Sequence, residues 1–208
     1  MPPQAVGAQV SYFRNYMTFS AGLLQPPYFD PRADSAVNYG AIGYVIGHEI
    51  GHIFDNEGAR VDAAGRLRDW WAPADASAFA ARINQLIGQL SSYELFPGEP
   101  LNARAVLRET MANLTGLEVA LDGYHASLGG ARASIIDGFT GDQRFFLSFA
   151  QTLRGKATEE FQRQNYDQAP FLVTVNGVVR NVDEWYEAFG VERGDRLYLE
   201  PQDRVRAW

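Results

Sequence analysis

The stretch His48-Glu49-Ile50-Gly51-His52 decides the fold, because it predicts a helix that carries a metal site. Side chains four residues apart lie on one face of an α-helix, so His48 and His52 can share one zinc ion at about 2.0–2.1 Å. Glu49 then lies beside the open coordination position, where it can activate a zinc-bound water. The alternative is two ordinary helix histidines around an accidental glutamate. We favour zinc because two of the three histidines form the motif, in a packed helix where unpaired polar groups are costly.

The sequence around this motif predicts a helix over residues 36–54, capped by Asp34 or Ser35. Four glycines on this helix are spaced three, four and four residues apart and form one stripe: Gly40, Gly43, Gly47 and Gly51. Each glycine costs roughly 1 kcal/mol of helix propensity relative to alanine. The stripe therefore predicts that another backbone packs closely against this face of the helix.

The third metal ligand is expected to be a carboxylate on another element. A metzincin would need glycine at position 55 and histidine at position 58, and the chain has Asp55 and Gly58 instead. No further histidine lies nearby in the sequence. Glu109 is the best candidate, since it lies in a second strongly helical stretch, residues 103–128. With this ligand the chain falls in the gluzincin branch of the HExxH class.

Helical periodicity also places the other polar residues of residues 103–128. Asn113 follows Glu109 by four residues and therefore lies on the same face. Glu118 and His125 fall on roughly the opposite face, and His125 is expected to be exposed or to cap the helix. We expect three further carboxylates to be solvated loop or turn residues: Glu57, Glu94 and Glu99.

The remaining chain predicts further helices with little strand. We expect an extended edge segment over 10–19 and a polar loop over 55–69 with Trp70 and Trp71 at its base. Three helices are expected: one capped by Asp75 and reaching Leu90, one over 143–164, and a short one over 183–189 capped by Asp183. Asn176-Gly177 predicts a β-hairpin over 171–179. The predicted fold class is therefore mainly α, with a helical core and a small edge sheet or hairpin.

Composition narrows the class of protein. The chain has 208 residues, 46% of them hydrophobic, so it can build one domain with a substantial core. The net charge of −7 argues against a nucleic-acid or acidic-membrane partner. The chain has no cysteine, no apolar stretch of membrane-spanning length and no signal-peptide pattern after Met1. We expect a cytoplasmic protein, or a secreted one only if an upstream segment is missing.

Several stretches together resemble the neprilysin and endothelin-converting-enzyme family of zinc metallopeptidases. They are residues 20–29, 38–43, 48–55, 69–71, 138–146, 176–181 and 203–208. The resemblance covers nearly the whole chain and implies a zincin-like, mainly helical catalytic lobe. It implies His48, His52 and Glu109 as ligands of one zinc ion and Glu49 as the general base. Asn113 and Asp55 are expected to contact the metal ligands without binding the metal, and so to orient them.

Some family residues are replaced in this chain. Gly7-Ala8 stands where the family has an Asn-Ala pair that holds the substrate backbone, and Asn113 stands where it has an aspartate. No histidine follows His125, although the family has a late histidine that stabilises the oxyanion, and the family's arginine position falls near Thr174. Losing one such donor typically costs about 10²–10³ in rate. Four residues are candidates to replace these groups: Tyr44, Tyr166, Gln168 and Arg180.

The favoured function is a zinc-dependent metallohydrolase, in which Glu49 activates a zinc-bound water for attack on a peptide or other amide bond. One alternative keeps the zinc as Lewis acid and Glu49 as acid/base on a small, non-peptide substrate, such as a biosynthetic intermediate. A second alternative is a binding module with structural zinc. Residues 1–208 are expected to form one neprilysin-type domain without the family's second lobe. The zinc face would then be open, or covered by a second copy or another protein.

Overall fold

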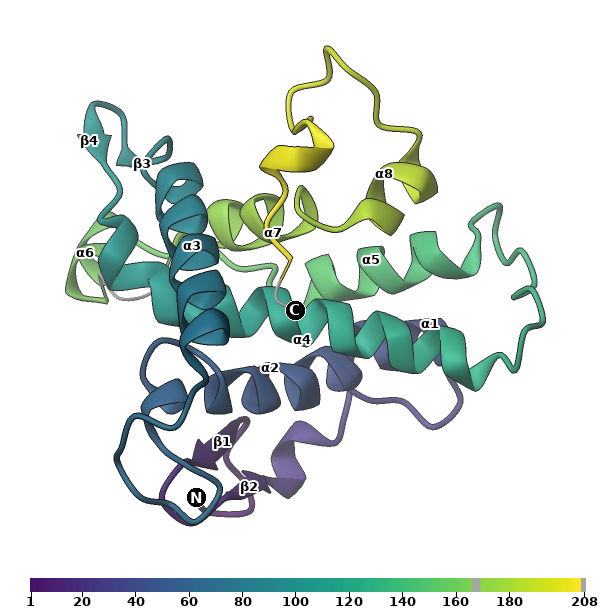
Figure 1. Cartoon of the computed structure of the whole chain (residues 1–208). Coiled ribbons are helices and arrows are strands. Elements are labelled where there is room, and N and C mark those ends of the chain that lie inside the picture. The colour runs from purple at the N-terminus through teal and green to yellow at the C-terminus, as the bar shows by residue number, and fades with distance from the viewer. Residues whose placement is uncertain (166–168, 207–208) are drawn as a thin grey trace.

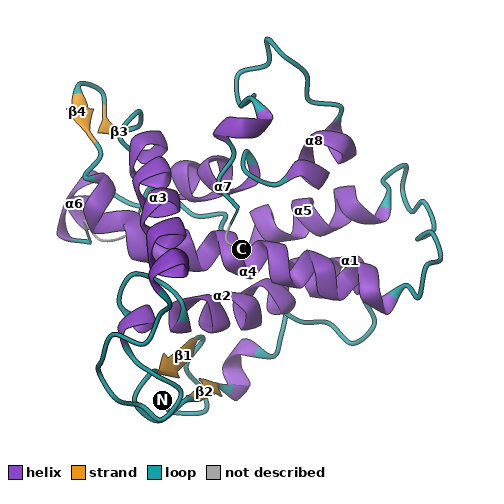
Figure 2. Ribbon diagram, viewed as in Figure 1, coloured by secondary structure: helices purple, strands orange, loops and turns teal. Residues whose placement is uncertain are grey.

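The architecture is a bundle of helices with two small antiparallel hairpins, which a computed structural model describes for residues 1–165 and 169–206 (Figure 1). The helices are α1 (Ser35–Asn38), α2 (Tyr44–Ile53), α3 (Pro73–Leu90), α4 (Ala103–Ser127), α5 (Gly141–Thr152), α6 (Glu159–Gln164), α7 (Phe171–Val179) and α8 (Asp183–Phe189). The strands are β1 (Ala8–Ser11) with β2 (Tyr16–Phe19), and β3 (Glu94–Phe96) with β4 (Glu99–Pro100). The predicted fold class, mainly α with a small hairpin, is confirmed (Figure 2).

The long helix α4 organises the core. Helices α2, α3 and α7 all pack against it, and α5 packs against α1 and the turn that follows α1. Its buried side chains include Val106, Leu117 and Tyr124, each fully shielded from solvent. Phe145 and Phe149 of α5 fill the space beside them. Within the described ranges, no helix combines the length and the hydropathy that a bilayer crossing requires.

The helix predicted over residues 36–54 forms, but in three parts. A π-helical turn, Tyr39–Gly43, joins α1 to α2 without breaking the helical path. Asp34 precedes α1 as predicted, yet its side chain makes no cap hydrogen bond. It instead accepts a hydrogen bond from Nε of Arg144 at 2.7 Å, which ties this end of the helix to α5. The wide turn lies where the backbone of Gly40 meets the carbonyl of Phe145.

The glycine stripe brings the backbones of α2 and α4 into direct contact, as predicted. A Cβ atom on Gly47 would lie 2.6 Å from the carbonyl oxygen of Gly116, and one on Gly116 would lie 2.5 Å from the nitrogen of His48. A Cβ on Gly51 would lie 3.0 Å from the Cα of Ala112. Gly43 is the exception, because its nearest neighbour is the ring of Tyr39 at an ordinary 3.4 Å.

The β-hairpin predicted over residues 171–179 is wrong, because these residues form helix α7. Valine costs less than about 0.7 kcal/mol per residue in a helix, whereas burying one gains about 1.5–3 kcal/mol. Val173 and Val178 are buried at 5% and 1% exposure against the core. The packing of α7 on α4 therefore outweighs the local preference of Asn176-Gly177 for a turn.

The helix predicted over residues 143–164 is interrupted. Helix α5 ends at Thr152, and α6 begins only after Thr158, whose side chain accepts a hydrogen bond from the Phe161 amide at 3.2 Å. Between them, a Cβ on Gly155 would lie 2.6 Å from the ring of Phe171. A glycine fits at this position because the aromatic ring occupies the space that a side chain would need.

Smaller corrections concern caps and the N-terminal segment. Asp75 and Asp183 lie inside the first turns of α3 and α8, and the residues that precede these helices are Ala72 and Val182. Carboxylates in the first turn still favour a helix through its dipole. The extended segment predicted over 10–19 is a hairpin that turns at Asn15, whose φ is 48°.

The loop over residues 55–69 is closed by the two tryptophans, as predicted. The indole nitrogens of Trp70 and Trp71 both donate to the carbonyl oxygen of Ala59, at 2.9 and 2.8 Å. The Trp71 ring also stacks on Phe79 of α3, with centroids 5.0 Å apart. These contacts hold the loop that follows the metal-site helix.

We predict that Gly47→Ala lowers the free energy of unfolding by about 1–3 kcal/mol or more, because its methyl group would meet the α4 backbone, which cannot move aside cheaply. The control is Gly88→Ala on α3, where a Cβ meets nothing within 4 Å. It should stabilise the chain by roughly 0.5–1 kcal/mol. Urea unfolding of both variants makes the comparison. Equal destabilisation of the two would contradict the close-packed contact.

Candidate metal centre

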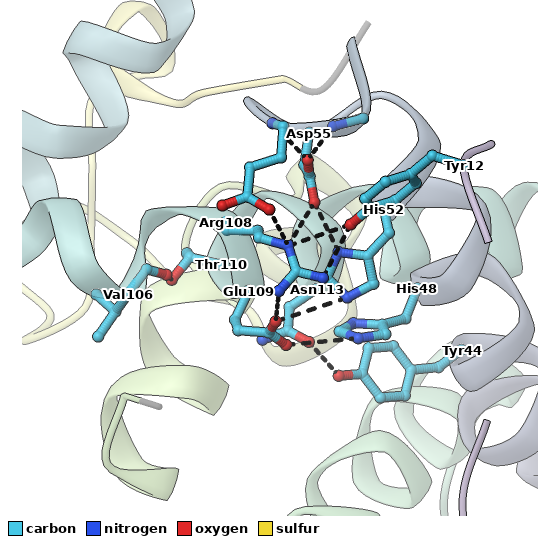
Figure 3. Close-up of polar contacts among 12 residues, drawn as sticks. Tyr12, Tyr44, His48, His52, Asp55, Val106, Arg108, Glu109, Thr110 and Asn113 are labelled. Atoms are coloured by element: carbon cyan, nitrogen blue, oxygen red, sulfur yellow. Dashed lines mark hydrogen bonds and ion pairs between the residues drawn. The ribbon is translucent and has the colours of Figure 1, made fainter. Parts of the chain in front are cut away.

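Helices α2 and α4 bring His48, His52 and Glu109 together (Figure 3). Nε2 of His48 lies 3.7 Å from Oε2 of Glu109, and Nε2 of His52 lies 3.7 Å from Oε1 of the same carboxylate. The ligand atoms of all three residues lie within 4.8 Å of one another. The glycine contact between the helices sets this spacing, because it fixes how closely the two backbones approach.

The donor set fits a tetrahedral metal. Four donors at about 2.0–2.1 Å from zinc would lie roughly 3.3–3.4 Å from each other. The two 3.7 Å separations need only a small closure to reach that value. Two imidazoles and one carboxylate leave a fourth position open, which is the pattern of catalytic rather than structural zinc sites. The three residues could therefore hold a metal ion.

Asp55 holds His52 from behind. Its Oδ2 lies 2.7 Å from Nδ1 of His52, so Nε2 of the imidazole is left facing the other ligands. Its Oδ1 accepts hydrogen bonds from the backbone amides of Glu57 and Gly58, both at 2.8 Å. The side chain of Asp55 is fully buried. Such a carboxylate fixes the ring orientation and raises the basicity of the ligand.

Asn113 lies beside His48 in the same cavity wall, and its amide oxygen also has a partner on α2. Its Oδ1 accepts from the hydroxyl of Tyr44 at 2.5 Å. Nδ1 of His48 is buried and has no hydrogen-bond partner among the described residues. The two histidines therefore differ, because a buried carboxylate holds Nδ1 of His52 whereas no described residue holds Nδ1 of His48.

Burial sets the protonation states at the site. It lowers the pKa of His48 to about 3, with His52 adding to the effect, so the imidazole is neutral and free to bind a metal. Burial also raises the pKa of Glu49, which His52 opposes and Glu109 reinforces. Glu49 is only 6% exposed. A carboxylate whose pKa is raised in this way is suited to proton transfer near neutral pH.

A cavity of about 430 Å³ opens directly beside the triad. One wall consists of residues of α2 and α4, among them His48, Glu49 and Glu109. The facing wall is largely apolar and comes from the segment between α5 and α7: Leu153, Ala157, Phe161, Pro170 and Phe171. The cavity therefore has a charged end at the metal site and an apolar body.

Of the residues considered as replacements, the structure brings Tyr44 to the cavity. Arg180 lies elsewhere and donates to the hydroxyl of Tyr93 at 3.2 Å. Tyr166 and Gln168 lie outside the described residues. Thr174 lines the cavity, where its hydroxyl donates to Ala169 at 3.2 Å.

Gly7 precedes β1, and its backbone is occupied internally. Its amide donates to the hydroxyl oxygen of Ser20 at 3.2 Å, and its carbonyl accepts from the same hydroxyl at 2.9 Å. His125 is on the surface, as predicted, where its Nε2 lies 2.8 Å from Oδ1 of Asp142. Neither residue contacts the triad.

Arg108 is the site residue that the sequence analysis missed. Its guanidinium lies against Asp55, Glu109 and the hydroxyl of Tyr12 (Figure 3). An arginine on a helix is ordinarily a solvated surface residue, and a neighbour in the sequence does not face it, so the sequence gives no sign that Arg108 lies at the site. Only the approach of the loop after α2 and of the N-terminal hairpin places it at the site.

Comparisons with known proteins agree with this geometry. The sequence profile described as peptidase family M13 matches residues 10–205. Neutral endopeptidase of Lactococcus lactis subsp. lactis (strain IL1403) is 33% identical over 211 residues, covering 100% of this chain and 32% of that protein. Endothelin-converting enzyme 1 of Homo sapiens is 34% identical over 214 residues, covering 100% of this chain and 27% of that protein.

A solved structure has the same fold. The Mycobacterium tuberculosis zinc metalloprotease ZMP1, in complex with an inhibitor, superposes with a TM-score of 0.95 at 45% sequence identity. The match covers 98% of this chain and 32% of that one. The chain thus spans less than a third of the length of the two curated relatives.

The low pKa of His48 predicts how the metal-free chain responds to acid. Its folded pKa of about 3 lies below the unfolded value of 6.5, so the unfolded state binds the extra proton between these values. The stability present above pH 6.5 is therefore lost as the pH falls, by at most about 1.4 kcal/mol per pH unit.

Urea unfolding in the presence of a chelator, between pH 7 and pH 5, measures this slope. His48→Gln is the matched variant, because it keeps a polar side chain and removes the titrating group. We expect a shallower fall of stability with acid in the variant. Parallel curves for the two proteins would contradict the prediction.

Proposed function

Because the chain belongs to peptidase family M13, we propose that it carries the zinc-binding catalytic site of a metallopeptidase that hydrolyses peptide bonds. One observation carries the proposal: His48, His52 and Glu109 converge, and His48 and Glu109 line a cavity together with the buried Glu49. A site that only held structural zinc would have no use for a carboxylate with a raised pKa beside the open position. The shared helical core supports treating residues 1–208 as one domain.

His48, His52 and Glu109 would hold the zinc ion, with Asp55 orienting His52 through the 2.7 Å contact. Bound zinc would supply Lewis-acid chemistry, lowering the pKa of water and polarising a carbonyl group. Glu49 would take the proton of the attacking water on its carboxylate and pass it to the leaving nitrogen. Its burial excludes bulk water from that carboxylate, which keeps the proton available for the second transfer.

Tyr44 is the side chain best placed to substitute for the missing oxyanion donors. It lines the cavity one helical turn before His48, and burial raises its pKa, so the phenol stays protonated. Its hydroxyl now donates to Asn113 at 2.5 Å. Because a phenol has only one proton, the hydroxyl would have to release Asn113 in order to donate to an oxygen that gains negative charge.

The cavity supports a preference for apolar side chains in the substrate. Its body is lined by Leu153, Phe161 and Phe171, while the carboxylates of Glu49 and Glu109 lie at the metal end. Burying apolar surface there gains about 25 cal/mol per Å². An acidic side chain would lose its hydration against these apolar residues and find no hydrogen-bond partner among them.

We predict that Glu49→Gln lowers kcat/KM for peptide hydrolysis by about 10²–10⁴, because the amide cannot accept the proton of water. Zinc binding should persist, since Glu49 is not among the metal-binding residues. Cleavage of a broad peptide library by the zinc-loaded chain, together with metal analysis, tests both parts. Full activity of Glu49→Gln would remove the role given to this residue.

The same library distinguishes peptide from non-peptide chemistry. A chain that binds one zinc ion and cleaves no peptide would overturn the peptidase proposal. That result would favour the reading in which the metal and Glu49 act on a small non-peptide substrate.

The relative rates at which peptides of the library are cleaved test whether the apolar cavity binds a side chain of the substrate. We expect peptides with phenylalanine or leucine next to the cleaved bond to be turned over at least tenfold faster than matched peptides with aspartate, since one or two buried methylene groups already supply that ratio. Competition between two such peptides in one reaction gives the ratio of kcat/KM directly. Equal rates would show that the cavity does not hold the substrate side chain.

A further inference from the structure

The guanidinium of Arg108 joins three segments that are far apart in the sequence. Its Nη2 donates to the hydroxyl of Tyr12, at the end of β1, at 2.9 Å. Its Nε lies 3.3 Å from Oδ2 of Asp55, and its Nη1 lies 3.3 Å from Oε1 of Glu109. Glu57 lies 3.5 Å away on the solvent side. The planar guanidinium thus contacts the N-terminal hairpin, the loop after α2 and helix α4.

Two of these contacts reach the metal triad itself. Oδ2 of Asp55, which faces Arg108, is the same atom that holds Nδ1 of His52. Oε1 of Glu109, which also faces Arg108, is the atom 3.7 Å from Nε2 of His52. Arg108 therefore contacts one prospective ligand, Glu109, directly, and reaches a second, His52, through Asp55.

The charge balance makes this contact more than a surface ion pair. Asp55 is fully buried and carries a carboxylate, and a buried charge without a compensating partner is costly. Its other described partners are two backbone amides and the imidazole of His52, so Arg108 supplies the permanent positive charge beside it. A lysine could not serve all three acceptors, because only the guanidinium presents donors in a rigid fork.

Tyr12 determines where the guanidinium lies. Both Nε and Nη2 donate to its hydroxyl, at 3.3 and 2.9 Å. Without that acceptor the side chain of Arg108, which is 37% exposed, would be free to turn toward Glu57 and solvent. The hairpin that carries Tyr12 also packs on α2. The hairpin is therefore linked to the metal-site helix directly, and again through Arg108 and Asp55.

We propose that Arg108 is a positioning residue of the metal centre, held in place by Tyr12, and that this pair couples the β1–β2 hairpin to the geometry of His52 and Glu109. Arg108 acts through Asp55 and Glu109 and does not itself bind the metal. The inference rests on the proposed function, since it concerns the zinc that these ligands would hold.

The experiment compares metal affinity and coordination geometry in residues 1–208 as the parent, Arg108→Met, Tyr12→Phe and the double variant, with Arg108→Lys and a control variant beside them. Zinc dissociation constants come from competition with a chromophoric chelator. The visible spectrum of the Co²⁺-substituted protein reports the ligand geometry. Circular dichroism before and after metal removal verifies that each variant is folded.

We expect Arg108→Met to weaken zinc binding by about 10–100-fold and to shift the Co²⁺ bands, which is the usual effect of removing a partner of a metal ligand. Tyr12→Phe, which removes a single hydroxyl, should give a smaller change in the same direction. The double variant should bind zinc no more weakly than Arg108→Met, because both residues act through one contact. Arg108→Lys should recover only part of the affinity.

The matched control is Arg163→Met. The side chain of Arg163 is 44% exposed and pairs with Glu99 and Glu159. The substitution therefore removes a comparable guanidinium and its ion pairs at a place that does not contact the triad. It should leave zinc affinity and the Co²⁺ spectrum unchanged.

Zinc affinity within twofold of the parent and an unchanged spectrum in both Arg108→Met and Tyr12→Phe would overturn the positioning role. Independent, additive losses in the double variant would overturn the coupling. If the folded parent itself binds no zinc, the proposed function fails, and the inference that rests on it fails too. If Arg108→Met does not fold, Tyr12→Phe alone decides the outcome.

Discussion

The contact between the backbones of α2 and α4 is the constraint on which the rest of the structure depends. Gly47 and Gly116 face each other with no room for a side chain, so the two helices lie closer than ordinary packing allows. That closeness puts a carboxylate of α4 within 3.7 Å of two imidazoles of α2. Gly47 and Gly116 lower the helix propensity of their segments, and in return they allow the short distance that a shared metal ion requires.

The site built on this contact is buried and unequally supported. His52 is held by a carboxylate that itself has four partners, while Nδ1 of His48 has none in the described part of the chain. Burial lowers the pKa of His48, which keeps the imidazole neutral and able to bind a metal, and it raises the pKa of Glu49, which favours proton uptake by this carboxylate. Asn113, the residue expected to support a histidine from α4, accepts a hydrogen bond from the hydroxyl of Tyr44 on α2.

The segment after α5 completes the cavity and shows how tertiary packing overrides local preference. The break at Gly155 allows the ring of Phe171 to approach, and α7 forms where Asn176-Gly177 favours a turn. The break after α5 agrees with the low helix propensity of glycine, whereas the helix α7 departs from local preference. Both place apolar side chains on the cavity that His48 and Glu109 also line. The wall of the cavity is therefore a consequence of how α7 packs on α4, and residues 171–179 alone do not indicate it.

The sequence by itself determined the family, the mainly helical fold, the face shared by His48 and His52, and Glu109 as their prospective partner. These features follow from helical periodicity, from glycine spacing and from motifs, all of which are local. Only the tertiary structure decided that residues 171–179 are helical, that Asn113 serves Tyr44, and that Arg108 reaches Asp55 and Tyr12. The physical reason is common to all three, because each depends on burial or on a contact between segments distant in the chain. Such energies do not appear in any local pattern of residues.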